Sequence, residues 1–204
     1  MKLYANYIWD FDGTLFDSYP HSIAALCETA RHFGIEHDPA AVIEAIHVTF
    51  PTAYRLLGVT EDQLAYFHTL RERRDYLPSV VPFPFVKEAL EHLISKGARH
   101  YLFTHSNHHM SVDYMADFSI DKLFSGFVTA DMNFPIKPAP DAILYILKEY
   151  GLDPRETVMV GDREIDILSG KNAGVDGILF DPDFRVKETC ADFRIEDFRA
   201  FMDA

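Results

Sequence analysis

Two aspartates stand at the end of a short apolar run near the N-terminus. The segment Tyr7–Ser18 reads YIWDFDGTLFDS, so Asp10 and Asp12 are separated by one residue and followed by Gly13. An Asp-Gly pair is an ordinary turn signal. A carboxylate in this place can also attack phosphorus and form an aspartyl-phosphate. Residues elsewhere in the chain distinguish between these two interpretations, a plain turn and a reactive site.

Three further segments carry residues that suit the same chemistry. The run HYLFT ends at Thr104, and Lys137 lies in FPIKPAPD. The run VMVG is followed by Asp162 and, four positions later, by Asp166. Sites in open α/β sheets form at the carboxyl ends of the strands. The sequence therefore predicts that four carboxylates, one hydroxyl and one ammonium group converge at one edge of a sheet.

This set of groups is suited to a phosphoryl group. Mg²⁺ takes oxygen ligands, often carboxylates together with phosphate oxygens. Thr104 can donate a hydrogen bond to a phosphoryl oxygen, and Lys137 can hold another as a point charge. Asp12 would protonate the leaving oxygen and later activate water, while Asp10 attacks phosphorus. Backbone N–H groups of the Gly13 turn can add anion contacts.

Apolar runs and helical periodicity alternate through most of the chain. Buried strands are predicted at 7–10, 100–104, 126–129, 157–161 and 177–181, and helices at 85–96, 141–150 and 165–173. Strands that alternate with helices of this length imply parallel pairing through right-handed crossovers. The predicted fold is α/β, a Rossmann-like open parallel sheet with helices on both faces.

One interval interrupts this alternation. About 70 residues after the first strand contain no strand-like run, and helices are predicted there at 20–33, 39–47 and 61–76. A structureless loop of that length is uncommon in a compact domain. We therefore predict a helical cap domain at 18–80, inserted into a catalytic core made of 1–17 and 81–204.

Composition limits the partners and the compartment. The 204 residues carry a net charge of −13, which argues against nucleic acid or an anionic membrane as the main partner. Cys27 and Cys190 are the only cysteines and form no paired motif, which is typical of a reducing compartment. No apolar segment approaches the roughly 20 residues of a spanning helix, and the N-terminus does not read as a signal peptide. We expect a cytoplasmic protein, either a monomer or a dimer.

The order DFDGT, LFT, KPAPD and GDREID resembles the haloacid dehalogenase-like (HAD) phosphohydrolase superfamily. The resemblance is closest to its phosphoglycolate-phosphatase-like branch, which has a small helical cap and shares Asp17, Ser18 and Pro20 after the first motif. It implies a Mg²⁺-dependent hydrolase of a small soluble phosphate ester that works through an aspartyl-phosphate.

The resemblance also implies a role for each motif residue in the metal site. Asp10 would be nucleophile and metal ligand, and Asp12 the acid and base with its backbone carbonyl on the metal. Asp162 would bind the metal, and Asp166 would bind it or orient a metal-bound water. Arg163 departs from the family, which often has a small serine there.

The expected phosphate ligands are Thr104 and Lys137, with Gly13 adding backbone contacts. His105 and Asn107 are candidates for the wall of the substrate pocket, although a structural role is the simpler interpretation for both. A zinc site built on His105, His108 and His109 is disfavoured, because adjacent histidines chelate poorly from one helix face.

Several alternative activities can be weighed from the sequence. A dehalogenase usually lacks the second aspartate, and a phosphonatase needs a cap lysine, whereas no lysine occurs from Phe16 to Phe85. A β-phosphoglucomutase-like mutase stays open, although His21 stands one position before its expected place, which Ser22 occupies. A non-catalytic phosphate-binding regulator is the third alternative.

Overall fold

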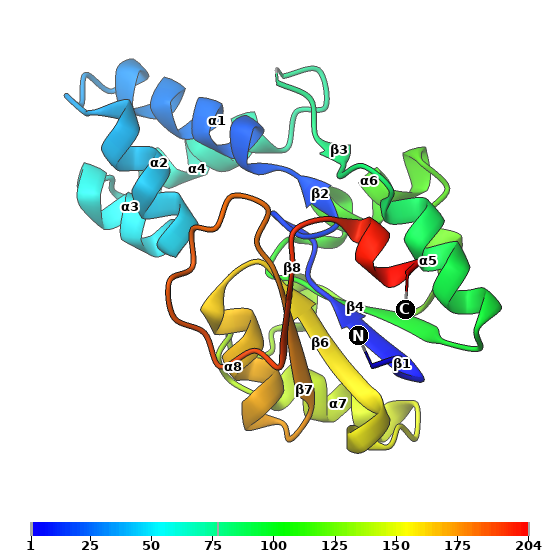
Figure 1. Ribbon diagram of the computed structural model, residues 1–204. Coiled ribbons are helices and arrows are strands. Elements are labelled where there is room, and N and C mark those ends of the chain that lie inside the picture. The colour runs from blue at the N-terminus through cyan, green and yellow to red at the C-terminus, as the bar shows by residue number, and fades with distance from the viewer. Residues whose placement is uncertain (1, 77, 204) are drawn as a thin grey trace. The chain divides into compact units, whose positions relative to one another are not determined.

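A computed structural model describes residues 2–76 and 78–203 and divides the chain into two compact units. The first, called the core unit below, comprises residues 1–16 and 82–204. The second, called the helical unit, comprises residues 17–81 and is coloured from blue to teal in Figure 1. That the helical unit acts as a cap stays a prediction.

A six-stranded sheet organises the core unit. Its order is β5-β4-β1-β6-β7-β8, and the strand pairs are parallel. The strands are β1 (Asn6–Trp9), β4 (Arg99–Phe103), β5 (Phe124–Val128), β6 (Thr157–Gly161), β7 (Asp176–Phe180) and β8 (Phe193–Ile195). The predicted α/β fold with an open parallel sheet is confirmed, and the five predicted strands lie within two residues of their expected bounds.

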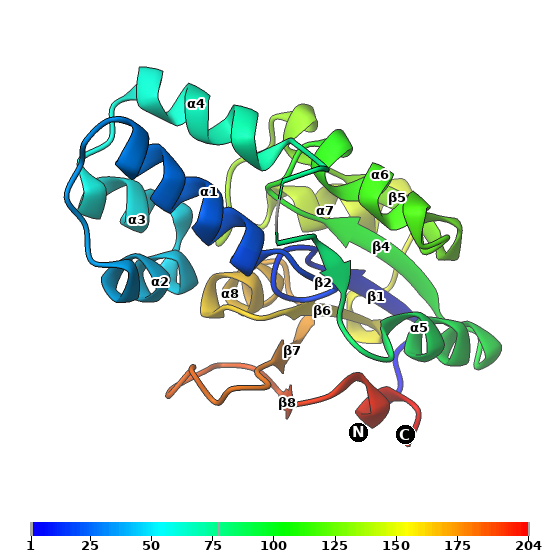
Figure 2. The same cartoon turned by 90° about the horizontal axis from the view of Figure 1, so that it is seen from above.

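Helices cover both faces of this sheet. They are α5 (Val86–Ser95), α6 (His108–Asp117), α7 (Asp141–Glu149) and α8 (Glu164–Asn172). Figure 2 shows α7 and α8 on one side of the sheet and α5 and α6 on the other. This is the arrangement that right-handed crossovers produce when the chain moves first to one edge of the sheet and then to the other.

Two different sets of apolar contacts pack against the sheet. On the α7 side, Ile8, Tyr101 and Met159 join Ile143 and Ile146 in one apolar cluster. Elsewhere in the core unit, aromatic rings dominate: Trp9 of β1 stacks on Phe198 at 5.9 Å between ring centroids and meets Phe201 edge-on at 5.2 Å. Both phenylalanines belong to a C-terminal 3₁₀ turn, η4 (Phe198–Phe201). The C-terminal residues therefore complete the core.

The helical unit has its own apolar core. It contains α1 (Tyr19–His32), α2 (Pro39–Val48), α3 (Phe50–Leu57) and α4 (Glu61–Arg71). Leu26, Ile46 and Phe67 are fully buried in the cluster that these helices share. The short strands β2 (Phe16–Asp17) and β3 (Val81–Pro82) pair where the chain passes between the two units.

The structure corrects several predicted elements. The sequence does not predict helix α3, because Pro51 indicates a boundary there. In the structure Pro51 stands in the first turn, where a proline favours the start of a helix, and Thr49 caps it. Helix α4 ends at Arg71 rather than Tyr76, where charged residues of the run RERR follow one another. Helix α6 and the three-residue strand β8 were not predicted.

Candidate active site

The ends of three neighbouring strands bring the motif residues to one edge of the sheet. Trp9, the last residue of β1, pairs with Leu102 on β4 and Val160 on β6. Asp10 continues this ladder, because its N–H donates to the carbonyl of Val160 at 2.9 Å. Thr104 continues β4 in the same way, donating to Val128 on β5 at 3.0 Å. The backbone ladder therefore positions both side chains at this edge.

Lys137 lies at the centre of the site and is almost fully buried, with 3% of its surface exposed. Its Nζ lies 2.6 Å from Asp10 Oδ1 and 2.9 Å from Asp166 Oδ1. A third contact, at 2.9 Å, goes to the carbonyl of Phe103 at the end of β4. Lys137 therefore donates hydrogen bonds to Asp10 and to Phe103 and forms an ion pair with Asp166.

The charges of these three groups depend on one another. Burial raises the pKa of Asp10, although the positive charge of Lys137 opposes this. Burial would also raise the pKa of Asp166, but Lys137 and Arg163 outweigh it and the pKa is lowered. Burial acts to lower the pKa of Lys137, but the two carboxylates outweigh it and the pKa is raised. The lysine therefore remains a cation between the two acids.

Three carboxylates form a cluster that could hold a metal ion. One oxygen from each of Asp10, Asp162 and Asp166 lies within 4.8 Å of the others. Asp10 Oδ2 is buried and has no hydrogen-bond partner among the described residues. A buried oxygen without a partner is often one that binds an ion or a water molecule. Carboxylate oxygens are the ligands preferred by hard divalent cations. These residues therefore fit a magnesium-type ion.

Neighbouring groups hold the carboxylates of this cluster in place. Thr14 donates from Oγ1 to Asp162 Oδ1 at 3.2 Å. Arg163 donates from its backbone N–H to Asp166 Oδ2 at 3.0 Å, and its Nε lies 3.9 Å from the same oxygen. Gly161 leaves room for this arrangement, because a Cβ there would come within 2.2 Å of Asp166 Cβ. Arg163 is therefore part of the support of Asp166.

Asp12 is held by a residue that the sequence analysis did not single out. Ser106 donates from Oγ to Asp12 Oδ2 at 2.6 Å, and both residues are buried. Neither Ser106 nor Thr14 was predicted to act in the site. Ser106 stands two positions after Thr104 and Thr14 belongs to DFDGT, so proximity to a motif was the only available signal.

The other predicted site residues have contacts of their own. His105 Nε2 accepts the backbone N–H of Lys137 at 3.0 Å. Burial and the charge of Lys137 lower the pKa of His105 to about 4, so its ring is neutral. Asn107 caps α6 by accepting the N–H of Met110 at 2.8 Å. Gly13, with φ of 76°, donates its N–H to the carbonyl of Phe16 at 2.8 Å.

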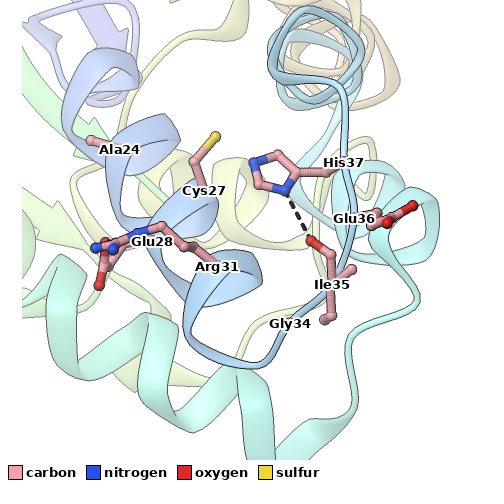
Figure 3. A pocket seen from close by; sticks show the side chains of 8 residues that line it. All are labelled: Ala24, Cys27, Glu28, Arg31, Gly34, Ile35, Glu36 and His37. Carbon is pink, nitrogen blue, oxygen red and sulfur yellow. Dashed lines mark hydrogen bonds and ion pairs between the residues drawn. The ribbon is translucent and has the colours of Figure 1, made fainter.

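A hollow of about 510 Å³ lies inside the helical unit. Figure 3 shows it between α1 and the loop that follows, with the Cys27 sulfur and the His37 ring directed into it. His37 Nδ1 lies 3.1 Å from the carbonyl of Ile35, and burial raises the pKa of the Cys27 thiol. None of the predicted site residues lines this hollow.

The chain is similar in sequence to known hydrolases. Residues 7–180 match the family model described as haloacid dehalogenase-like hydrolase. Phosphoglycolate phosphatase 1 of Pseudomonas aeruginosa is 28% identical over 82% of this chain and 66% of its own length. Fructose-1-phosphate phosphatase YqaB of Escherichia coli is 28% identical over 86% of this chain and 95% of its own.

A solved structure agrees with these matches. A hydrolase from Streptococcus pneumoniae TIGR4 is 31% identical, with a TM-score of 0.66 over the full length of both chains. In residues 2–76 and 78–203, no helix is long and apolar enough to cross a membrane.

Proposed function

Because this chain belongs to the haloacid dehalogenase-like hydrolase family and groups there with phosphatases, we propose that Asp10 is the nucleophile of a Mg²⁺-dependent phosphate monoester hydrolase. One observation carries the proposal. The Lys137 ammonium group is buried between Asp10 and Asp166, within the cluster of three carboxylates. A fully desolvated cation beside a carboxylate suits the attack on a phosphoryl anion.

The first half of the reaction transfers the phosphoryl group to the enzyme. An oxygen of Asp10 attacks phosphorus, the bond from phosphorus to the ester oxygen breaks, and the leaving oxygen takes a proton from Asp12. The Thr104 hydroxyl donates to a phosphoryl oxygen, while its own oxygen accepts the N–H of Ser106 at 3.0 Å. The products of this half are an alcohol and an aspartyl-phosphate.

The second half releases inorganic phosphate. Asp12, now deprotonated, takes a proton from water as the water oxygen attacks phosphorus. The bond from phosphorus to Asp10 breaks, which restores the carboxylate beside Lys137. Mg²⁺ held by Asp10, Asp162 and Asp166 would supply positive charge to the phosphoryl oxygens.

The substrate proposed is a small soluble phosphate ester of the phosphoglycolate type. Two of the matched relatives are named for phosphoglycolate and fructose 1-phosphate, and both of these esters are compact. The free thiols of Cys27 and Cys190 suit a reducing compartment, so we place this activity in the cytoplasm. A mutase or a phosphate-binding regulator gains no specific support from a contact in the site.

The first test is phosphate release from a panel of esters. Phosphoglycolate, fructose 1-phosphate and p-nitrophenyl phosphate are incubated with Mg²⁺ or with EDTA. We expect release that needs the metal and that Asp10→Asn lacks, because the amide keeps the shape of the side chain and loses its nucleophilic oxygen.

Asp75→Asn serves as the matched control. Its side chain is 74% exposed and pairs with Arg73 in the helical unit, so the same change there should leave turnover unaltered. An Asp10→Asn variant that releases phosphate at the wild-type rate contradicts the covalent mechanism. A wild-type protein that isomerises a sugar phosphate without releasing phosphate favours the mutase.

A further inference from the structure

The loop that follows β4 contains a buried serine that contacts the proposed acid and base. Ser106 Oγ lies 2.6 Å from Asp12 Oδ2, and the two residues have 2% and 6% of their surfaces exposed. The distance of 2.6 Å lies at the short end of the range for O–H···O hydrogen bonds. Because the hydroxyl donates to Oδ2, the other carboxyl oxygen, Oδ1, can carry a proton. This contact joins two segments that are 94 positions apart in the chain.

Ser106 is itself held at both ends of its backbone. Its N–H donates to Thr104 Oγ1 at 3.0 Å. Its carbonyl accepts the N–H of Ala130, which follows β5, at 3.1 Å. The serine hydroxyl is therefore carried on a segment fixed to the ends of β4 and β5, which makes it a rigid reference point for Asp12.

We propose that Ser106 is a positioning residue that fixes the Asp12 carboxylate for proton transfer to the leaving group. The inference rests on the proposed function, because it concerns the proton that Asp12 gives to the ester oxygen. The side chain of an aspartate can occupy several staggered rotamers. A buried hydroxyl that binds one carboxylate oxygen selects one of these rotamers before substrate arrives.

The predicted effect depends on how much the leaving group needs a proton. An alkyl ester leaves as a strongly basic alkoxide and needs Asp12, whereas p-nitrophenolate leaves readily without a proton. The ratio kcat/KM reports the steps through departure of the leaving group. Ser106→Ala should therefore lower kcat/KM for an alkyl phosphate and leave kcat/KM for p-nitrophenyl phosphate nearly unchanged.

The size of the loss follows from the role of the proton. Positioned proton transfer contributes roughly 10²- to 10⁴-fold to a rate. In Ser106→Ala the Asp12 carboxyl group is present but poorly oriented, so kcat/KM for an alkyl phosphate should fall by about tenfold or more. KM for the alkyl ester should change little, because Ser106 holds Asp12 and not the substrate. Ser106→Thr keeps the hydroxyl and should restore most of kcat/KM.

Ser111→Ala is the matched control. Ser111 is also buried, and its Oγ donates to the carbonyl of Asn107 at 2.7 Å on the neighbouring helix. Removing that hydroxyl costs a buried hydrogen bond without touching Asp12, so both esters should be hydrolysed as in the wild type. Unfolding of each variant, followed by Trp9 fluorescence, checks that the core unit is intact.

Crystal structures of wild type and Ser106→Ala provide a readout that does not depend on turnover. A displaced or split Asp12 carboxylate in the variant supports the proposal, and an unmoved one overturns it. Equal losses for the two esters, or no loss for either, also overturn it while leaving the phosphatase standing. A wild-type protein that releases phosphate from no ester overturns the proposed function and the positioning role of Ser106 together.

Discussion

The Lys137 side chain shows how far a single residue can determine the charge balance of this site. It is buried, and its Nζ contacts two carboxylates and one carbonyl oxygen. Without the lysine, Asp10 and Asp166 would face each other in a region that excludes water. Removal of one partner from a buried ion pair is strongly destabilising, because it leaves an uncompensated buried charge.

We therefore predict that Lys137→Met lowers the free energy of unfolding by about 3–5 kcal/mol in the absence of metal. Lys171→Met is the control, since Lys171 pairs with Asp192 near the surface and such pairs contribute about 0–1 kcal/mol. Urea unfolding of both variants measures the difference. Equal losses would contradict the view that Lys137 is a buried counter-charge.

For individual residues, the sequence predicted which residue types lie close together in the site, but not which side-chain contacts they make. Asp10, Thr104 and Asp162 could be placed at strand ends, and Lys137 in the segment after the third predicted strand, because parallel strands end at one edge of a sheet. The contact of Ser106 with Asp12 depends on the path of a loop and on one side-chain rotamer. Neither has a periodic signature in the sequence, so this part of the site could be found only in three dimensions.

Among the elements, β4 carries a histidine whose environment favours the neutral form. His100 is fully buried, and its Nδ1 accepts the Trp9 indole N–H at 3.0 Å. Its Nε2 lies 3.1 Å from the carbonyl of Leu90, to which it donates. Burial lowers the pKa of His100 to about 4. Protonation would therefore place a proton against the Trp9 donor and a charge in an apolar core.

This arrangement predicts a pH dependence of stability. The pKa of histidine in the unfolded chain is about 6.5. Because the folded pKa is lower, the contribution is complete above pH 6.5 and is lost as the pH falls from 6.5 toward 4. The full loss is on the order of 3 kcal/mol. Urea unfolding at pH 7.5 and pH 5 should show about 2 kcal/mol of this loss, and His100→Asn should have a flatter dependence.

The outcome for His100→Asn distinguishes this histidine from the acids that titrate in the same range. Asn keeps an acceptor near the Trp9 indole but cannot take a proton. If wild type and His100→Asn lose stability equally between pH 7.5 and 5, the histidine is not the source. The expected result is that the gap between their unfolding free energies narrows as the pH falls.

The elements themselves were predictable where the chain repeats a pattern and unpredictable where it does not. Strands β1 and β6 are fully buried runs bounded by turn signals, β4 is buried except at Arg99, and all three were found in the sequence. Helix α6 begins with His108 and His109 and has little apolar periodicity, while β8 is only three residues long. The place of β8 is set by its pairing with β7, and a local pattern carries no information about such contacts.

The whole molecule carries a strong excess of acid, with a net charge of −13. Part of that excess is concentrated at the carboxyl edge of the sheet, where Asp10, Asp162 and Asp166 lie together and burial already raises the pKa of Asp10. A divalent cation bound there would offset this repulsion. Because the cluster requires the folded sheet, binding of the cation should also stabilise the fold.

Mg²⁺ should therefore raise the stability of the core unit, whether or not an ester is present. A ligand at a hundred times its Kd stabilises the folded state by about 2.7 kcal/mol. Trp9 is the only tryptophan of the chain and lies beside Asp10, so its fluorescence reports the unfolding of the unit that contains the site. Asp162→Asn should lose most of the Mg²⁺ effect, since it removes one carboxylate of the cluster. Asp75→Asn should keep it, because it changes the net charge equally at an exposed place in the helical unit. Equal stabilisation of the two variants would show that Mg²⁺ acts through the general acidity of the molecule and not through this site.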